Sequence, residues 1–544
     1  MTLRSILLAT TAAALVAASS SVWAQAMHPV TGEALSDNQT FTYRVLDEFP
    51  SIDPGLVEDV EGSHIARNLF EGLMNQDAEG NVVPGVATGY TVSDDGLVYT
   101  FTLRDNAVWS DGQPVTAGDF EYAWRRAADP ATASPYAWYM ELMQLENAGA
   151  IVAGEAAADT LGVTAIDDLT LEVRLATALP YFAQMVTHTT TFPVPQWVIE
   201  ANGDNWTQPG IMVSNGAYVL SERVPQEKIV LTRNPAYWDN ANTIIETVTA
   251  LIINDENQAL TRWTAGEIDQ TDVPVGQFPS LLEQYPTETF SVPNLCSYYY
   301  NVNMTETGDP ALQDVRVRQA LALAIDRDII TQNILAAGQV SAYSLTHWAV
   351  AGYEVPSSEF AELSQADRDA RAVALMTEAG FGPGGETLTF DILFNTSDAH
   401  QSIAVAIGQM WKQKLGVETT LANQEWQTFL DARGSQQYEI ARAGWCADYN
   451  EASSFLDIMQ SDSGYNDSAF VNEGYDALLA EARLAADPLP LYQQAEAILV
   501  QEFPIIPIYF YSTVLMQDDT IKGYPFENAQ ENWYARAMYR VAAE

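Results

Sequence analysis

The chain has 544 residues, 47% of them hydrophobic, which is too long for a single core and predicts two or three domains. Acidic residues outnumber basic residues 72 to 24, and the resulting net charge of -48 argues against nucleic acid or an anionic membrane surface as a partner. An acidic surface that keeps the protein soluble in salt explains this charge most simply, although the charge also weakly favours cationic ligands.

A targeting segment is predicted at the start of the chain. Arg4 precedes an apolar stretch, residues 5–18, that is too short to span a bilayer. Residues 24–26 read Ala-Gln-Ala, a small-x-small cleavage pattern, so we expect residues 1–26 to be a signal peptide. No cysteine follows the apolar stretch, which predicts an exported, periplasmic protein without a lipid anchor.

Strands dominate the first half of the predicted structure. Alternating or β-rich apolar patterns predict strands over 41–46, 97–103, 169–175 and 248–253. Helical spacing predicts a helix over 62–73. Thr116 and Asp119 match a capping box that opens a second helix through Trp124.

The second half alternates strands and helices. A strand is predicted over 296–302, and Asp314 caps a helix whose apolar face includes Val317 and Leu321. Strands follow at 388–394, 417–421 and 438–443, separated by helices at 403–415 (ended by Gly416) and 425–433. Short strands joined by helices predict parallel pairing, so we expect an α/β lobe over 296–514.

One acidic residue, Asp448, follows the strand at 438–443. Gly444 is expected to turn the chain there, and Asp448 then lies at the carboxyl end of a strand, between Trp445 and Tyr449. A buried carboxylate requires a cation, and a peptide's N-terminal ammonium is one. The alternative is structural: Asp448 caps a turn and Trp445 fills the core.

The cysteines and histidines leave little room for a metal site. The two cysteines, Cys296 and Cys446, favour a single disulfide in an oxidising compartment, with two buried free thiols as the alternative. Five dispersed histidines add too few ligands for a metal site. We therefore expect no metal and no cofactor.

Catalytic signatures are missing from the sequence. It has no Gly-Lys-Ser/Thr phosphate loop, no Rossmann glycine fingerprint, no HExxH and no Gly-x-Ser-x-Gly. These absences favour a binding protein over an enzyme.

Eight stretches carry a resemblance to a known family. They are NLFEGL (68–73), WSDGQPVTAGDF (109–120), ADPATASPYA (128–137), RNPAYWDN (233–240), DVRVRQALALAIDRDII (314–330), NTSDAH (395–400), NQEWQTFLDAR (423–433) and ARAGWCADYNEA (441–452). Together they cover nearly the whole mature chain, which resembles the periplasmic oligopeptide-binding proteins of extracellular solute-binding protein family 5. These proteins are the ligand-capturing subunits of peptide ABC importers.

The resemblance implies a two-lobed α/β periplasmic binding protein fold, with three domains and a hinge, that encloses its ligand between the lobes. Domain I would comprise 27–70, 196–295 and 515–544, domain II 71–195, and domain III 296–514. The implied function is capture of short peptides with broad sequence tolerance and delivery to the permease subunits of an inner-membrane ABC importer, by a monomer. One dedicated ligand (a murein peptide, a dipeptide or a metal chelate) and a chaperone-like holder of chains are the alternatives.

The resemblance also implies roles for individual residues. Those for the peptide N-terminus are Asp448 and Tyr136; for its backbone and side-chain pockets Glu58, Val60, Trp426, Trp445 and Gly444; for its C-terminus Arg433, Arg442 and His400; and for the disulfide Cys296 and Cys446. The chain departs from the family in two places. It has no lysine in ITQNILAAG, the segment after Asp328, and Asn301 stands where a glutamate often follows the tyrosine run. Both changes bear on the preferred length and composition of the peptide.

Overall fold

The computed structural model describes residues 25–382 and 384–543. All but the last two residues of the predicted signal peptide lie outside this range. No helix within the described residues is both long enough and apolar enough to cross a membrane.

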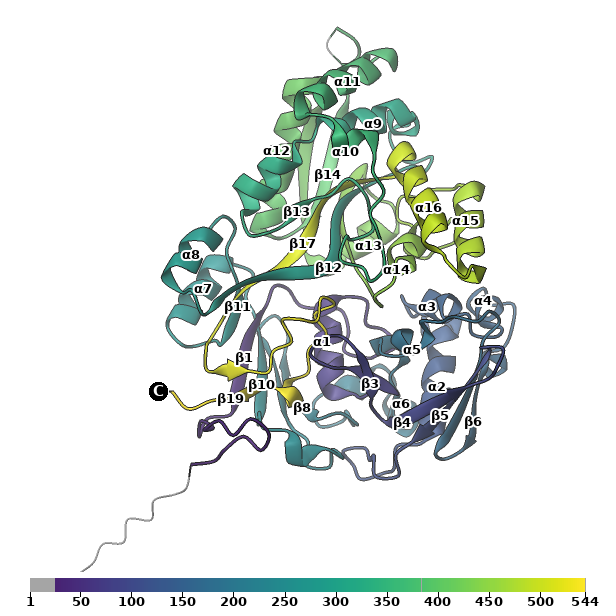
Figure 1. The fold of residues 1–544 in the computed structure, drawn as a ribbon, viewed down its shortest axis with the longest axis vertical. Helices are drawn as coiled ribbons and strands as arrows, with labels where there is room; N and C mark the ends of the chain where they lie inside the picture. Colours follow the sequence, from purple (N-terminus) through teal and green to yellow (C-terminus); the bar gives the residue numbers. More distant parts are fainter. Residues whose placement is uncertain (1–24, 383, 544) are drawn as a thin grey trace, which may run out of the picture.

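One large mixed sheet runs through both halves of the molecule (Figure 1). Its strands follow the order β15 (Glu418–Gln424), β14 (Thr389–Asn395), β16 (Ile440–Cys446), β12 (Thr289–Val302), β17 (Ile505–Gln517), β11 (Gln270–Asp272), β1 (Thr40–Val45), β10 (Thr247–Ile252), β9 (Lys228–Arg233) and β8 (Tyr218–Val224). The short β13 (Val340–Ser341) pairs with β17 beside this path.

The two long strands β12 and β17 connect the lobes. They pair antiparallel from Thr289 opposite Met516 to Asn301 opposite Ile505, with a register shift between Pro293 and Ser297. Proline has no N–H to contribute to the ladder, so a break in pairing at this position is expected.

The C-terminal lobe confirms the predicted parallel pairing. β14 pairs parallel with both β15 and β16, and helices α12 (Asp398–Leu415) and α13 (Trp426–Gly434) lie between these strands in the sequence. Gly416 ends α12 with a φ of 71°, a conformation that glycine adopts without strain. β16 is antiparallel to β12 on its other side, so the sheet as a whole is mixed.

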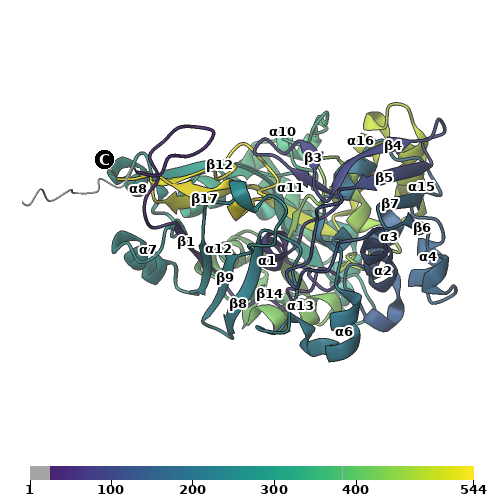
Figure 2. The same cartoon turned by 90° about the horizontal axis from the view of Figure 1, so that it is seen from below.

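A second, antiparallel sheet lies in the N-terminal half. Its order is β4 (Ala87–Val92), β5 (Val98–Leu103), β7 (Thr170–Arg174) and β6 (Val163–Asp167), and α2 (Ala117–Ala128) packs against it. The predicted capping box is present, with the Asp119 carboxylate accepting a 2.8 Å hydrogen bond from the Thr116 amide. Figure 2 shows this sheet and α2 at one end of the molecule, away from β1.

The remaining elements are mostly short. They are α1 (Val60–Leu69), β2 (Met74–Gln76), β3 (Val82–Pro84), α3 (Ala137–Leu142), α4 (Ala148–Val152), α5 (Phe182–Met185), α6 (Gln196–Asn202), α7 (Glu256–Thr264), α8 (Phe278–Gln284), α9 (Val315–Ala324), a π-helical segment (Ile329–Leu335), α10 (Glu359–Glu362), α11 (Gln365–Glu378), α14 (Ser453–Leu456), α15 (Glu473–Leu484), α16 (Leu489–Glu502), β18 (Ile521–Lys522) and β19 (Tyr539–Arg540).

One local prediction is wrong, and the bounds of another are shifted. Gly444 does not turn the chain but lies inside β16, opposite Tyr298 of β12, because the cross-strand ladder continues through it to Cys446. The helix predicted over 62–73 occupies Val60–Leu69 instead. It starts earlier because the Asp59 side chain caps it by accepting a hydrogen bond from the Gly62 amide.

Candidate functional site

A cavity of about 480 Å³ lies between elements of the two lobes. Its walls come from the end of β1, the loop into α1, helices α12 and α13, and strands β16 and β17. Every site residue predicted from the sequence lines it: Glu58, Val60, Tyr136, Cys296, His400, Trp426, Arg433, Arg442, Gly444, Trp445, Cys446 and Asp448. The structure therefore brings together residues that lie up to 390 positions apart (448 minus 58).

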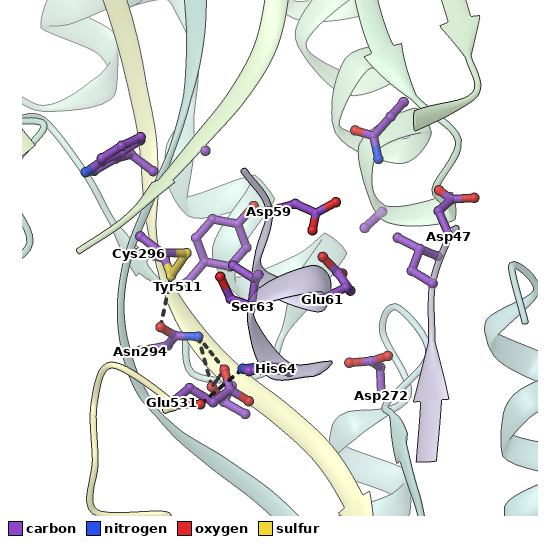
Figure 3. A pocket seen from close by; sticks show the side chains of 18 of the residues that line it. Asp47, Asp59, Glu61, Ser63, His64, Asp272, Asn294, Cys296, Tyr511 and Glu531 are labelled. Atoms are coloured by element: carbon purple, nitrogen blue, oxygen red, sulfur yellow. Dashed lines mark hydrogen bonds between the residues drawn. A yellow bond between two sulfur atoms is a disulfide. The ribbon is translucent and has the colours of Figure 1, made fainter. Parts of the chain in front are cut away.

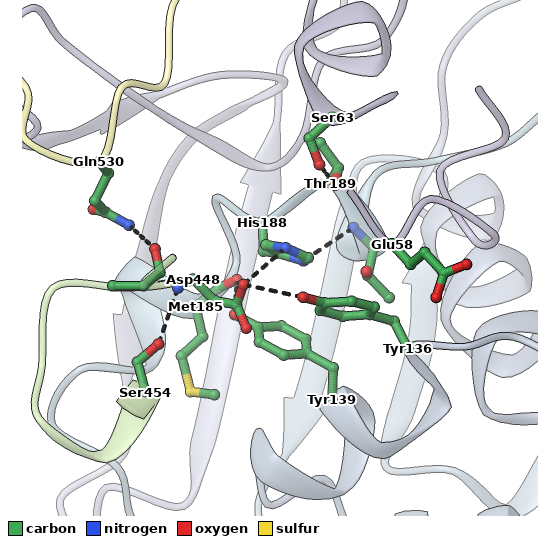
Figure 4. A network of polar contacts seen from close by, with 12 residues as sticks. Glu58, Ser63, Tyr136, Tyr139, Met185, His188, Thr189, Asp448, Ser454 and Gln530 are labelled. Atoms are coloured by element: carbon green, nitrogen blue, oxygen red, sulfur yellow. Dashed lines mark hydrogen bonds and ion pairs between the residues drawn. The ribbon is translucent and has the colours of Figure 1, made fainter. Parts of the chain in front are cut away.

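Asp448 lies where it was expected, just past the carboxyl end of β16 (Figure 4). Its own amide donates to the Ser454 hydroxyl at 2.9 Å, which fixes the loop. The carboxylate faces two residues of the N-terminal half: Oδ1 lies 3.4 Å from Nε2 of His188 and 3.5 Å from the hydroxyl of Tyr136. Burial and the charge of Asp448 raise the pKa of Tyr136 well above its usual value, so this hydroxyl remains a donor.

The second oxygen of this carboxylate, Oδ2, is buried and has no hydrogen-bond partner among the described residues. The side chain as a whole is also buried, with 8% of the Asp448 surface exposed. Both contacts to Oδ1 are long for hydrogen bonds. A buried carboxylate satisfied on one side only is costly, so the geometry provides for an additional donor with a positive charge.

Aromatic rings surround this carboxylate. Trp445 and Tyr465 meet edge to face with centroids 5.0 Å apart, and Tyr136 meets Tyr465 at 5.5 Å. Tyr136 also stacks on His188 at 5.1 Å. The Trp445 indole donates to the Ser454 carbonyl at 2.6 Å, so this ring packs in the core and lines the cavity at once. The low-dielectric surroundings strengthen any ion pair made by Asp448.

Arg442 provides a cation on β16, six residues before Asp448. It donates to the Tyr511 hydroxyl at 2.8 Å and lies over the Tyr298 ring at 5.3 Å. No carboxylate within the described residues forms an ion pair with it, and its Nε has no partner there. Its guanidinium is therefore available to an anionic group in the cavity.

Arg433 differs from Arg442 because it already has a counter-ion. Its Nε lies 2.7 Å from Asp467 Oδ2, and both side chains are about nine-tenths buried. Burial raises the pKa of the nearby Glu58, and the Arg433 charge opposes that shift. A ligand carboxylate at Arg433 would compete with Asp467.

His400, in the first turn of α12, is buried at the cavity wall, and its Nδ1 has no hydrogen-bond partner among the described residues. Burial, together with the charge of Arg442, holds the pKa of His400 well below its usual value. The ring is therefore neutral, and it offers one N–H donor rather than a charge.

Two further predicted residues, Val60 and Gly444, line the cavity. Val60, the first residue of α1, is 42% exposed although it is apolar. At Gly444, an added Cβ would meet Nη2 of Arg442 and the Tyr511 hydroxyl, each at 3.4 Å. The absence of a side chain at Gly444 leaves the strand's backbone open to a ligand's main chain.

The disulfide predicted from the resemblance is present. Cys296 and Cys446 are bonded and stand opposite each other in the β12–β16 ladder. The bond lies two residues before Asp448 and joins its loop to β12, one of the strands that connect the lobes.

Several cavity residues were missed by the sequence analysis. The most direct is His188, which meets Asp448 although it was read as one of the dispersed histidines. No local pattern in the sequence around it signals this contact, because it arises only when the lobes pack. Others that line the cavity are Tyr465, Asp47, Asp59, Glu61 and Asp272.

A model of the bacterial extracellular solute-binding proteins, family 5, matches residues 81–467. The periplasmic oligopeptide-binding protein OppA of Salmonella typhimurium is 43% identical over 546 residues, covering 99% of each chain.

Two solved structures, one with a bound peptide and one in an unliganded open form, allow the arrangement of the lobes to be compared. A complex of Haemophilus influenzae OppA with RPPGFSPFR superposes with a TM-score of 0.90 at 36% identity, covering 93% of this chain and 100% of the other. The unliganded open form of the periplasmic murein tripeptide-binding protein MppA gives a TM-score of only 0.68, although it is 42% identical and the match covers 94% of this chain and 99% of the other. The lobes here are thus arranged more like those of the peptide complex than those of the open form.

Proposed function

Because this chain belongs to family 5 of the bacterial extracellular solute-binding proteins, we propose that it captures short peptides and delivers them to the permease of a peptide ABC importer. Relatives named as oligopeptide-binding proteins match it over nearly their whole length, which supports peptides as the ligand class.

The observation that carries the proposal is the half-satisfied carboxylate of Asp448. It lies at a buried end of the cavity that is lined by aromatic rings. Its Oδ2 accepts no hydrogen bond from any described residue. A peptide's terminal ammonium supplies both the missing donor and the charge. Arg442, which lacks a carboxylate partner among these residues, is the counterpart for the peptide's terminal carboxylate.

Tolerance of many peptide sequences is expected because the cavity contacts the parts that all peptides share. The charged ends and the backbone are common to all peptides, and the exposed Val60 and bare Gly444 leave room for main-chain contact. Side chains then project into space where water adapts to different shapes.

This proposal includes three domains. Domain I comprises 27–70, 196–295 and 515–544, domain II comprises 71–195, and domain III comprises 296–514. Its boundaries at 295/296 and 514/515 fall inside β12 and β17. The β12 boundary lies in the stretch where the register shifts, between Pro293 and Ser297. A break in pairing is a suitable place for a hinge that opens and closes the lobes.

The protein's setting is proposed with its function. A periplasmic binding subunit would be exported by a signal peptide, here residues 1–26, and would carry no lipid anchor. It would also be a monomer and would not act as an enzyme. A single dedicated ligand is the second candidate, since a murein tripeptide-binding protein is 42% identical to this chain.

Native mass spectrometry of the exported protein, purified without refolding, tests the proposal. A spread of added masses that sequence as short peptides is the expected result. A single discrete added mass would instead establish a dedicated ligand.

A further inference from the structure

Residues 528–532 of the C-terminal tail, with the sequence Asn-Ala-Gln-Glu-Asn, form a segment that we call the amide strap. Gln530, Glu531 and Asn532 of this strap line the cavity. The side chain of Gln530 donates a hydrogen bond of 3.0 Å to the main-chain carbonyl of Ala447, the residue before Asp448 (Figure 4). The strap therefore contacts the loop that carries the Asp448 carboxylate, although it lies 83 residues further along the chain.

The hydrogen bond from Gln530 fixes one side of a single peptide group. The Ala447 carbonyl and the Asp448 amide belong to the same planar unit, and in a trans peptide they point in opposite directions. The carbonyl accepts from Gln530, and the amide donates to the Ser454 hydroxyl at 2.9 Å. A peptide plane held on both sides resists rotation, so the direction in which the Asp448 side chain leaves the main chain is fixed as well.

Glu531 anchors the strap to the two strands that connect the lobes. Its carboxylate accepts hydrogen bonds from Asn294 at 2.7 Å, Thr513 at 2.8 Å and Tyr524 at 3.0 Å. Figure 3 shows the contact between Asn294 and Glu531. Asn294 lies in the break of the β12–β17 pairing, and Thr513 is on β17 beside it. The strap is therefore held at a defined place next to the Asp448 loop.

The backbone of the strap is strained at Glu531. This residue has a φ of 57°, in the left-handed region that residues with a side chain seldom adopt. The amide of Leu295, in the same break of β12, donates to the Ala529 carbonyl at 2.7 Å and supports the turn. Strain of this kind persists only where the surrounding contacts enforce it, and it is often found at functional sites.

The amide group of Gln530 is oriented by a second glutamine. Gln76, at the end of β2, is 4% exposed and donates to Oε1 of Gln530 at 2.8 Å. The Gln76 oxygen accepts from Asn528 at 3.0 Å and from Asn532 at 2.8 Å. Because two donors face this oxygen, the Gln76 nitrogen faces Gln530, and the Gln530 nitrogen faces the Ala447 carbonyl. The four side chains form a directed network of neutral hydrogen bonds that ends on the loop.

Neutral contacts suit a loop whose carboxylate has to receive a cation. A lysine or arginine at position 530 would compete for Asp448, and an acidic residue would repel it. An amide holds the loop without compensating its charge. The other contacts of the loop are also neutral: the Ala447 amide donates to the Leu295 carbonyl at 2.8 Å, and Cys446 is bonded to Cys296. Oδ2 of Asp448 is left without a partner among the described residues.

We propose that Gln530 is a positioning residue for the peptide's N-terminus: through the Ala447–Asp448 peptide group it holds the Asp448 carboxylate in the orientation that receives the ammonium. Its side chain is only partly buried, and the disulfide still ties the loop when Gln530 is replaced. This inference rests on the proposed peptide-binding function and adds a residue on which recognition of the N-terminus depends.

Isothermal titration of a tripeptide and of its N-acetylated form, with the wild type and with Gln530→Met, tests the inference. Methionine keeps the length of the side chain and removes both the donor and the acceptor. Gln530→Met is expected to bind the free tripeptide about tenfold more weakly than the wild type and the acetylated form equally well. Gln494→Met makes the same replacement at an exposed position outside the cavity and is expected to change neither affinity.

The comparison separates positioning from general support of the cavity. Equal losses for the free and the acetylated tripeptide, or no loss for either, would overturn the inference and leave the proposed function standing. If the wild type binds neither peptide, the proposed function itself fails, and this inference fails with it. Gln530→Ala repeats the comparison with a smaller side chain, and the melting transition of each variant confirms that it is folded.

Discussion

The carboxylate of Asp448 and the imidazole of His188 are in contact at the cavity wall, with 3.4 Å between Oδ1 and Nε2. Asp448 comes from the loop after β16, and His188 from the segment between α5 and α6. The contact therefore joins the two lobes at the end of the cavity that we propose to receive the peptide's N-terminus. The other carboxylate oxygen, Oδ2, has no hydrogen-bond partner among the described residues.

Replacing Asp448 with asparagine is expected to reduce the affinity for a short peptide by about 2–5 kcal/mol. The variant keeps the shape but leaves the buried ammonium without its counter-charge. Isothermal titration measures the change, and Asp94→Asn, at an exposed position outside the cavity, serves as the matched control. An unchanged affinity would remove Asp448 from the site.

Arg442→Gln is expected to weaken binding of a peptide with a free terminal carboxylate by about 1.5–3 kcal/mol, because a charge-assisted hydrogen bond is lost. The same variant should bind the C-terminally amidated peptide about as well as the wild type does. The double comparison isolates the carboxylate from the rest of the peptide. Equal losses for the free and the amidated peptide would mean that Arg442 acts only through the protein's own packing.

Arg433→Gln is expected to act on stability. It leaves the buried Asp467 without its partner at 2.7 Å, and breaking a buried pair in this way costs about 3–5 kcal/mol. Denaturant unfolding of Arg433→Gln and Arg442→Gln side by side measures the difference. If Arg442→Gln were the more destabilised of the two, the roles assigned here would be reversed.

The Cys296–Cys446 disulfide closes a long loop, with a sequence separation of 150, so its reduction is expected to lower the free energy of unfolding by about 2–5 kcal/mol. Thiol titration of the unreduced, denatured protein should find no free thiol. Two free thiols per chain would contradict the bond, and an unchanged unfolding midpoint after reduction would contradict its contribution to stability.

The pH dependence of stability reports on the ionisation of Asp59. Burial raises the pKa of Asp59 to about 7 in the folded protein, above its unfolded value of about 3.9. The folded state thus binds this proton more tightly, and the stability it contributes is complete below pH of about 4 and is lost as the pH rises through about 7. The wild type should therefore lose stability relative to Asp59→Asn between pH 4 and 7.

Melting curves of both proteins across this range check the prediction. A constant difference between them would show that Asp59 ionises as it does in the unfolded chain.

The sequence was sufficient for features that depend on local pattern or on matched motifs. The position of Asp448 just past the end of a strand was predicted correctly, and the Cys296–Cys446 disulfide was favoured by the cysteine count and implied by the resemblance. The parallel pairing of β14 with β15 and β16 followed from the helices between them. Each of these features depends on residues that are close together in the sequence or on a stretch that matches the family.

Features decided by tertiary contacts were missed or misread. Gly444 carries the local signal of a turn, yet its pairing opposite Tyr298 keeps it in the strand. His188 and Asp448 are 260 residues apart (448 minus 188), and nothing near either residue points to the other. The burial of Asp59 was equally hidden, because in so acidic a chain no sequence pattern distinguishes it from a solvated surface aspartate.

The most direct test of the account is an isothermal titration of the unliganded wild-type protein with one tripeptide and with its N-acetylated form. The account predicts that acetylation, which removes the ammonium, weakens binding by about 2–5 kcal/mol, as Asp448→Asn does. It also predicts that acetylation costs little further affinity in the Asp448→Asn variant, because the two changes remove the same ion pair. Equal binding of the free and the acetylated peptide by the wild type would contradict the central claim that Asp448 receives the peptide's N-terminus.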